Sequence, residues 1–282
     1  MKLYFSHPLV DHDHAFGIIG RPIALKAVLP AYVPGRRVRI SAFRGGHRVW
    51  TNKVAPRRDG PRGVAVARYT TERTGPVTFK AARGRVNARP RKLWVHTWNV
   101  SFGARSVVVS LAQRRLAHLG YRAYDTGVYD GATGRAILAW RKVNNWSRTQ
   151  YMGRAVLGRL IRDKGAFHPK YPKHGRHVEA DLSRQVIALI DTGGKVFKTF
   201  PISSGKPSTP TVLGHFRFYR KDFGTNSEGM VDSNYFIGGY AIHGYPSVPN
   251  YPASHGCLRA FIADAYYIYT HISLGERIDV YP

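Results

Sequence analysis

The most informative part of the sequence consists of Ala241-Ile242-His243-Gly244 and Ser254-His255-Gly256-Cys257-Leu258-Arg259, with residues 245–253 between them. Cys257 is the only cysteine, so it cannot form a disulfide within the chain and is an inert buried residue, a metal ligand or a nucleophile. His243 and His255 precede it, and each is followed by a glycine, which lets backbone N–H groups approach a reacting atom closely. An imidazole also draws a thiol toward the thiolate. This combination indicates an activated nucleophile.

Two other kinds of site use the same residue types. A zinc ion held by His243, His255 and Cys257 is chemically reasonable, but a structural zinc site normally has four ligands and more cysteines. A papain-like peptidase carries its cysteine before its histidine, and this chain has the reverse order. We therefore expect no metal and no cofactor at this site, with zinc as the alternative.

Positive charge is concentrated in the first two thirds of the chain. Residues 1–98 contain 20 Lys and Arg against 4 acidic residues and residues 99–175 contain 14 against 3, whereas residues 176–282 contain 10 against 9. This asymmetry favours a front part that holds a polyanion and a back part that carries out chemistry. The alternative is a solvated basic face without a partner.

No stretch approaches the roughly 18 consecutive apolar residues of a membrane helix, so no membrane span is expected. The first residues, Met1 to Pro8, lack the apolar core of a signal peptide. Either an export signal lies outside this chain or the protein is not exported by that route.

Residues 1–98 are predicted to form a small β-sandwich. Apolar and polar residues alternate in short runs separated by Gly and Pro turns, at 23–29, 37–43, 48–50, 64–69 and 77–82. The pattern resembles the immunoglobulin-like modules of bacterial surface proteins. The Cys…Trp…Cys signature of true immunoglobulin domains is missing.

Residues 99–163 are predicted to form a small three-helix domain. Apolar residues recur with helical spacing in 106–121, where Gly120 is placed to end a helix, and Asp130 is a candidate N-cap of the next helix. The order of Leu119-Gly120-Tyr121 and Tyr129-Asp130-x-x-Thr133 resembles the peptidoglycan-binding module of cell-wall hydrolases. Trp140-Arg141-Lys142 stands where that family usually has Phe-Gln, and an ordinary helical hairpin is the alternative.

Residues 164–176 are rich in Pro, Gly and basic side chains without periodicity, which predicts a linker. From residue 177 to residue 282 the pattern predicts mainly β-strands. Expected strands include 185–190, the hairpin partner 196–200 and a strand starting at Tyr240 that delivers His243. A helix is expected within 261–271.

The C-terminal motifs resemble those of the L,D-transpeptidase (YkuD-type) catalytic domain. Besides the two segments quoted first, the flanking elements match in order, namely Asp181-Leu182-Ser183-x-Gln185, Ser204-Gly205, Pro210-Thr211-x-x-Gly214-x-Phe216 and Gly275-Glu276-Arg277-Ile278. The resemblance covers residues 177–282. The whole chain is thus expected to be multidomain, with a mainly-β catalytic domain after the β-sandwich and the helical module.

The resemblance implies a role for each site residue. Cys257 would be the nucleophile and His243 the general base and acid, oriented by the backbone carbonyl of Gly244. The N–H groups of Gly256 and Cys257 would stabilise the oxyanion. The remaining assignments are a supporting role for His255 and substrate binding by Arg259, Ser254 and Tyr240.

By resemblance, the reaction is acyl transfer on peptidoglycan stem peptides through a cysteine thioester, which forms cross-links. The alternatives are an L,D-carboxypeptidase on the same peptides and a non-catalytic wall-binding protein. The expected partners are stem peptides and anionic wall polymers; nucleic acid is not expected, since no nucleic-acid motif is found. The expected location is extracytoplasmic, at the cell wall or cell surface.

Overall fold

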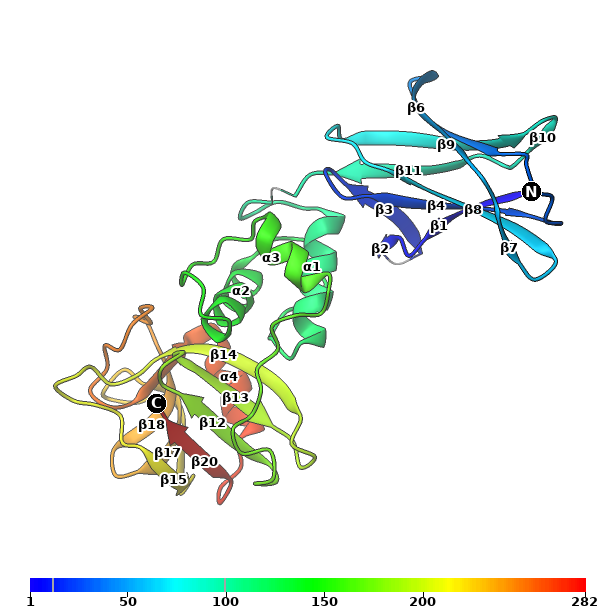
Figure 1. The fold of residues 1–282 in the computed structure, drawn as a ribbon. Helices are drawn as coiled ribbons and strands as arrows, with labels where there is room; N and C mark the ends of the chain where they lie inside the picture. The colour runs from blue at the N-terminus through cyan, green and yellow to red at the C-terminus, as the bar shows by residue number, and fades with distance from the viewer. Residues whose placement is uncertain (12, 99) are drawn as a thin grey trace. The chain divides into compact units, whose positions relative to one another are not determined.

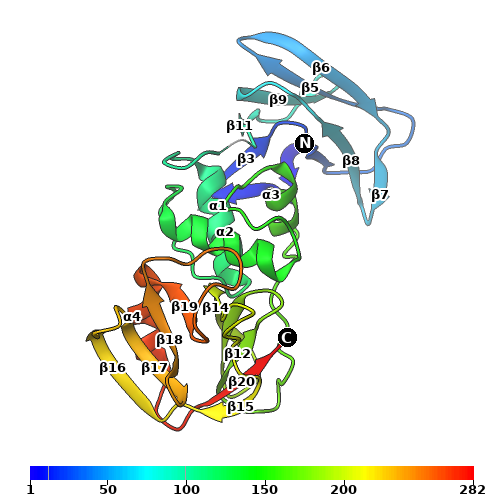
Figure 2. The same ribbon diagram turned by 90° about the vertical axis from the view of Figure 1, so that its left-hand side faces the viewer.

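The computed structural model describes residues 1–11, 13–98 and 100–282. They form two compact units, residues 1–100 and 101–282 (Figures 1 and 2). Residue 99, at which the helical module is expected to begin, lies outside the described residues. No helix in the described parts of the chain is long and apolar enough to cross a membrane.

The unit of residues 1–100 contains two β-sheets with a shared hydrophobic core. The strand orders are β1-β4-β8-β7 and β2-β3-β11-β9-β5-β6, with β10 paired to β9. The strands of the first sheet are β1 (Lys2–Ser6), β4 (Ile23–Leu29), β7 (Arg57–Asp59) and β8 (Arg62–Tyr69). Those of the second are β2 (Leu9–Asp11), β3 (His14–Ile18), β5 (Val38–Arg44), β6 (His47–Val54), β9 (Gly75–Arg83), β10 (Val86–Asn87) and β11 (Arg91–His96).

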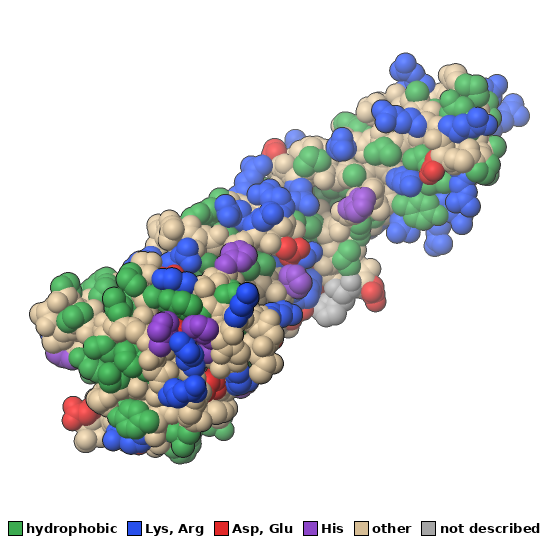
Figure 3. Space-filling view, turned by 60° about the horizontal axis from the view of Figure 1, so that its bottom comes forward, with side chains coloured by type: hydrophobic (Ala, Val, Ile, Leu, Met, Phe, Trp, Pro, Cys, Tyr) green, Lys and Arg blue, Asp and Glu red, His purple; other side chains and the backbone are tan. Residues whose placement is uncertain are grey.

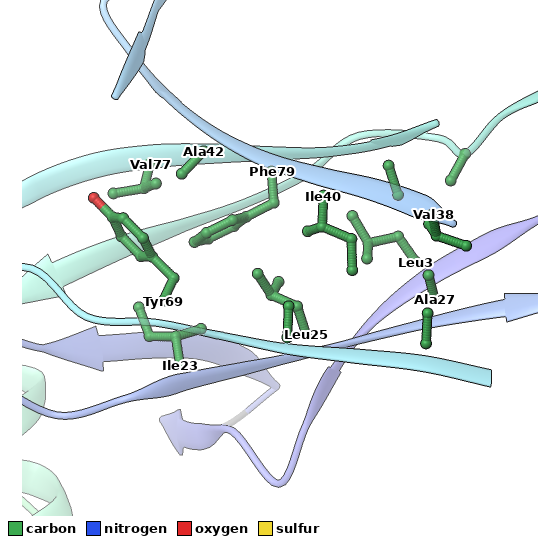
Figure 4. Close-up of a cluster of buried hydrophobic side chains, with 14 of the residues drawn as sticks. Leu3, Ile23, Leu25, Ala27, Val38, Ile40, Ala42, Tyr69, Val77 and Phe79 are labelled. Carbon is green, nitrogen blue, oxygen red and sulfur yellow. The ribbon is translucent and has the colours of Figure 1, made fainter. Parts of the chain in front are cut away.

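Alternation of side chains explains how the two sheets pack. In β4, every second residue is buried, because successive side chains of a strand point to opposite faces. Ile23 and Leu25 of that strand point toward Ile40 and Phe79 of the other sheet (Figure 4). This region therefore forms the expected β module, while its immunoglobulin likeness stays a prediction. Lys and Arg side chains are spread over the surface (Figure 3).

Three helices follow, α1 (Val107–His118), α2 (Gly131–Val143) and α3 (Arg154–Leu160). Asp130 is the N-cap of α2, as expected, and its carboxylate accepts a hydrogen bond from the Thr133 amide at 2.8 Å. Gly120 follows the end of α1 with a φ of +85°, a conformation in which glycine ends helices readily.

The helical segment packs in the same compact unit as the C-terminal sheet. The Thr199 amide donates to the carbonyl of Gly120 at 2.7 Å, and the guanidinium of Arg135 is paired with Asp264 at 2.9 Å. A separate three-helix domain is therefore not confirmed. Residues 164–176 contain no helix or strand, although Phe167 within them is buried. The boundaries at residues 163 and 176 stay predictions.

The C-terminal part is a nine-stranded sheet with the order β15-β20-β12-β13-β14-β19-β18-β17-β16. The strands are β12 (His177–Asp181), β13 (Val186–Ile190), β14 (Val196–Ser203), β15 (Gly214–Arg217), β16 (Arg220–Thr225), β17 (Val231–Ile237), β18 (Tyr240–Tyr245), β19 (Leu258–Phe261) and β20 (Arg277–Tyr281). Helix α4 (Ile262–His271) contributes Ile268 to the core that the sheet encloses. The fold of this region is the mainly-β fold expected for it.

Candidate active site

Two parallel strands bring the two sequence motifs together. In the pairing of β18 with β19, Ile242 lies opposite Leu258 and His243 opposite Arg259. Ile242 and Leu258 are fully buried in the core, so His243 and Arg259 point to the other face of the sheet. Cys257 immediately precedes β19. The motifs that residues 245–253 separate in sequence are thus neighbours in the sheet.

A hydrogen bond to the backbone of the next residue holds His243 in one tautomer. Its side chain is buried, and its Nδ1 lies 2.9 Å from the carbonyl oxygen of Gly244. Because a carbonyl only accepts, Nδ1 carries the proton and Nε2 is left as an acceptor. Burial lowers the pKa of His243 to about 4; the bond to Gly244 opposes this shift and the charge of Arg259 adds to it. The imidazole is therefore neutral at neutral pH.

Cys257 is half-buried at the start of β19. Its thiol donates to the carbonyl oxygen of Gly239, with Sγ 3.6 Å from that oxygen. Burial raises the pKa of Cys257, while a backbone hydrogen bond from Ala241 and the charge of Arg259 act in the opposite direction. The thiol is thus protonated at neutral pH, and attack by sulfur requires a base that takes up its proton.

Ser254 shapes the turn that leads into Cys257. Its hydroxyl accepts from the Gly256 amide at 3.0 Å and donates to the Cys257 carbonyl at 2.6 Å. The Ser254 side chain is buried, and these bonds fix the geometry of the turn; its contact with substrate stays a prediction. The Gly256 amide, which the sequence analysis assigns to the oxyanion, donates to Ser254 in this structure, and its role toward an oxyanion stays a prediction.

Glycine is required at position 256 because of its backbone conformation and the close approach of a neighbouring ring. Its φ is +117°, and a Cβ atom placed there would lie 1.7 Å from Cε1 of Tyr240. Any other residue would clash with that ring and strain the backbone. Tyr240 therefore packs over the turn, and its ring also borders the core of the sheet.

Thr211, which is not among the predicted site residues, stabilises the same turn by two hydrogen bonds. The Thr211 hydroxyl accepts from the Gly205 amide at 2.9 Å and donates to the Gly256 carbonyl at 2.8 Å. Thr211 is buried, so these bonds are shielded from water. The Pro210-Thr211 motif was recognised in the sequence, but its role in this turn was not.

A second network connects the turn to helix α2. The Gln185 side chain bonds both the amide and the hydroxyl of Ser204, at 2.9 and 2.7 Å. The Ser204 carbonyl in turn accepts from the Ser254 amide at 2.9 Å. Lys142 of α2 donates to the Gln185 carbonyl at 3.3 Å. Burial, aided by the charge of Arg148, lowers the pKa of Lys142 to about 7.

The other predicted residues lie on different sides of the turn. The Arg259 guanidinium is 4.1 Å from the centre of the Tyr245 ring, which meets the His243 ring edge-on at 5.7 Å. Tyr245 was not predicted. His255 is exposed, and its Nε2 lies 3.3 Å from Nζ of Lys206.

A groove beside Ser204 and Gly205 is lined further by Leu182, Pro210, Leu213 and Pro252.

Comparisons with known proteins give a match for the region that contains this site. Residues 175–280 match the family described as the YkuD L,D-transpeptidase catalytic domain. A crystal structure of an L,D-transpeptidase (residues 123-326) from Xylanimonas cellulosilytica is 30% identical, with 64% of this chain and 97% of that chain covered and a TM-score of 0.59.

Two further solved structures are less similar. An L,D-transpeptidase from Stackebrandtia nassauensis is 19% identical over 66% of this chain and 96% of that chain, with a TM-score of 0.40. A mutant L,D-transpeptidase from Enterococcus faecium is 25% identical over 38% of this chain and 50% of that chain, with a TM-score of 0.34. The search of curated proteins gave no match. The family match and the Xylanimonas structure together show that this chain belongs to the family of proteins with a YkuD-type L,D-transpeptidase catalytic domain.

Proposed function

We propose that this chain is a peptidoglycan L,D-transpeptidase that cross-links stem peptides through a thioester on Cys257. The observation that carries the proposal is the bond from Nδ1 of His243 to the Gly244 carbonyl, which leaves Nε2 as the base. That base lies on β18, the strand paired with β19, and Cys257 immediately precedes β19. Family membership supports the substrate class.

The first half-reaction acylates the enzyme. Nε2 of His243 removes the proton of the Cys257 thiol while Sγ attacks the carbonyl carbon before a terminal D-alanine. When the tetrahedral intermediate collapses, the C–N bond breaks and the imidazolium returns its proton to the leaving amine. D-Alanine departs and the acyl group remains as a thioester. Because both resting groups are neutral, proton transfer accompanies the attack instead of preceding it.

The second half-reaction transfers the acyl group to an amine of a neighbouring stem peptide. Nε2 of His243 accepts a proton from that amine as nitrogen attacks the thioester, and the thiol of Cys257 is regenerated. The new amide bond is the cross-link. If water attacks in place of the amine, the same residues act as an L,D-carboxypeptidase.

The oxyanion is assigned to the Cys257 amide. The Gly256 amide is bonded to Ser254, so it contributes only if that bond opens. Arg259 is assigned to a substrate carboxylate, since a guanidinium presents a fork of donors that matches it. Its stacking on Tyr245 keeps the fork in place beside His243.

The test uses the full chain and a stem tetrapeptide ending in D-alanine. We expect D-alanine release and, by mass spectrometry, a dimer that is one D-alanine lighter than two donors. Cys257→Ala should abolish both, and His243→Gln should slow release about 10²- to 10⁴-fold. His168→Gln, at an exposed histidine, serves as the matched control. A tripeptide product without a dimer would identify the carboxypeptidase.

A carbapenem gives an independent readout of the thiol. By resemblance to the family, it should add one covalent adduct to the chain, located on Cys257. The adduct should be absent in Cys257→Ala. Unmodified parent protein and unchanged biological activity in Cys257→Ala would together support the non-catalytic wall-binding alternative.

The basic surface supports an anionic wall polymer as a further partner and a location outside the cytoplasm. Residues 1–98 carry 20 Lys and Arg against 4 acidic residues, and such contacts weaken as salt screens them. Binding to purified sacculi should therefore decrease between 50 and 300 mM salt, because the Debye length falls through about 10 Å within this range. Binding independent of salt would contradict this partner.

A further inference from the structure

A group of histidines and carboxylates lies in the C-terminal sheet away from Cys257. His215 belongs to the edge strand β15, Asp279 to its neighbour β20, and His174 to the segment before β12. Three strands, β12, β13 and β14, separate β20 from β19 in the sheet. This group is therefore distinct from the candidate active site.

The donor atoms of the three side chains converge. Nδ1 of His174 lies 2.8 Å from Oδ2 of Asp279, and Nδ1 of His215 lies 2.6 Å from Oδ1. All three ligand atoms are within 4.8 Å of one another. In the described part of the chain, no other group of at least three His, Cys, Asp or Glu side chains comes as close.

We propose that His174, His215 and Asp279 form a binding site for a zinc ion. Two imidazoles and one carboxylate are a donor set that zinc takes in proteins, with a water molecule completing the tetrahedron. A ring that binds zinc through Nδ1 carries its proton on Nε2, so Nδ1 gives up the hydrogen bond that it makes to Asp279. The carboxylate is fully buried, whereas the His215 side chain is 49% exposed and leaves a path for the ion and its water.

The distances require only small side-chain movements. Donors about 2.1 Å from a tetrahedral zinc lie about 3.4 Å from one another. The distances from Nδ1 of His174 to Oδ2 and from Nδ1 of His215 to Oδ1 are 2.8 and 2.6 Å, about 0.6 and 0.8 Å shorter than this spacing, and all the ligand atoms lie within 4.8 Å of one another. Because His215 is half exposed, its ring can move without disturbing the core.

Neighbouring side chains already orient the ligands. The ring of Tyr171 stacks on that of His174 at 4.8 Å and meets that of His215 edge-on at 5.2 Å. Nε of Arg277 donates to Oδ1 of Asp279 at 2.7 Å, a kind of bond that ligating carboxylates commonly have. The positive charge of Arg277 beside Oδ1 repels a zinc ion there, so zinc coordination through Oδ2 of Asp279 is favoured. Nε2 of His177 lies 3.9 Å from that oxygen and adds a further cationic neighbour when protonated.

Zinc at this position has a structural consequence. It joins the edge strand β15 and its neighbour β20 to residue 174 of the segment that the sequence predicts as a linker. That segment would then be fixed to the sheet without a helix or strand of its own. The sequence analysis considers zinc only at His243, His255 and Cys257 and expects no metal. It does not single out His174, His215 and Asp279, which are far apart in the chain.

The test measures zinc binding by the full, untagged chain carrying Cys257→Ala, so that the thiol contributes nothing. Equilibrium dialysis against Zn²⁺ followed by elemental analysis should give one zinc per chain at micromolar metal. His215→Asn should weaken this binding at least tenfold, because an amide can still donate to Asp279 but is a poor zinc ligand. His168→Asn, at an exposed histidine nearby in sequence, should bind zinc like the parent.

Folding of the variant is checked separately. Without zinc, His215→Asn should unfold within about 2 °C of the parent, and saturating zinc should raise the Tm of the parent but not of the variant. His174→Asn provides a second variant with the same expectation. The proposal is overturned if the parent binds no stoichiometric zinc at 100-fold excess, or if both Asn variants bind it as tightly as the parent.

Discussion

The ammonium group of Lys142 in helix α2 donates a hydrogen bond to the carbonyl oxygen of Ile202 in strand β14, at 2.8 Å. A second bond reaches the Gln185 carbonyl. The Gln185 side chain holds Ser204, and the Ser204 carbonyl holds the amide of Ser254. One buried cation of the helical segment is thus connected, through three polar residues, to the turn that presents Cys257.

Lys142 should make stability depend on pH. Burial lowers its pKa from 10.5 in the unfolded chain to about 7 in the folded one, so between these values only the unfolded chain holds the proton. The free energy of unfolding should therefore rise with pH across this window, by up to about 5 kcal/mol. Urea titrations at pH 7, 8.5 and 9.5 measure this rise. It should be much smaller in Lys142→Met than in Lys195→Met, an exposed control, because Lys198 and Lys221 also have a lowered pKa and leave a residual rise; equal slopes in both variants would refute the assignment.

The fall of kcat/KM at acid pH should follow the protonation of His243. Its pKa is lowered to about 4, chiefly by burial, so the ring stays a competent base well below pH 6.5. We expect kcat/KM for D-alanine release to fall with a midpoint near pH 4. Arg259→Gln removes a charge that lowers this pKa, so its midpoint should move upward by a fraction of a pH unit. A midpoint near 6.5 in the parent would contradict the buried, neutral ring.

The same ring contributes to stability in a defined window. A histidine with a pKa of about 4 when folded and 6.5 when unfolded holds fewer protons in the folded state between these values. Its contribution to stability is therefore complete above pH 6.5 and is lost as the pH falls toward 4. His243→Gln should flatten this part of the stability curve, as measured by urea unfolding at pH 4.5, 5.5 and 7.

Gly256→Ala should damage the turn before Cys257. The new methyl group would overlap the Tyr240 ring, and φ at this position lies in the left-handed region. We expect a loss of about 2–4 kcal/mol of stability and at least a tenfold loss of D-alanine release. Gly158→Ala in helix α3 is the control, because its Cβ meets no atom within 4 Å, and it should leave activity intact. Normal activity of Gly256→Ala would exclude the close packing described here.

Thr211→Val tests whether a hydroxyl fastens this turn. Valine keeps the shape but leaves the Gly205 amide and the Gly256 carbonyl without this partner. Two unpaired buried groups, at about 1–3 kcal/mol each, should lower the stability by about 2–6 kcal/mol and should lower kcat more than they change KM. Thr225→Val, at an exposed position of β16, should behave like the parent. If both variants unfold at the same denaturant concentration, the hydroxyl is dispensable.

Local patterns were sufficient for the strands that have one apolar face and for the two capped helices. The run Ile23–Leu29 alternates because one face packs on the opposite sheet, and Asp130 caps α2 through atoms three residues away. Strand β17 escaped prediction because Asp232, Ser233 and Asn234 are polar yet buried. A prediction from the pattern of apolar residues in a short segment assigns such a polar run to a loop.

The candidate pair of Cys257 and His243 could be proposed from residue types and order alone, because a lone cysteine and two His-Gly motifs lie in a short segment. The partners of Lys142 and the convergence of His174, His215 and Asp279 could not. A lysine in a helix is ordinarily solvated, and residues 41 and 64 positions apart meet only because β15, β20 and β12 lie side by side. Such long-range strand pairing depends on the packing of the whole sheet, which leaves no trace in a local pattern.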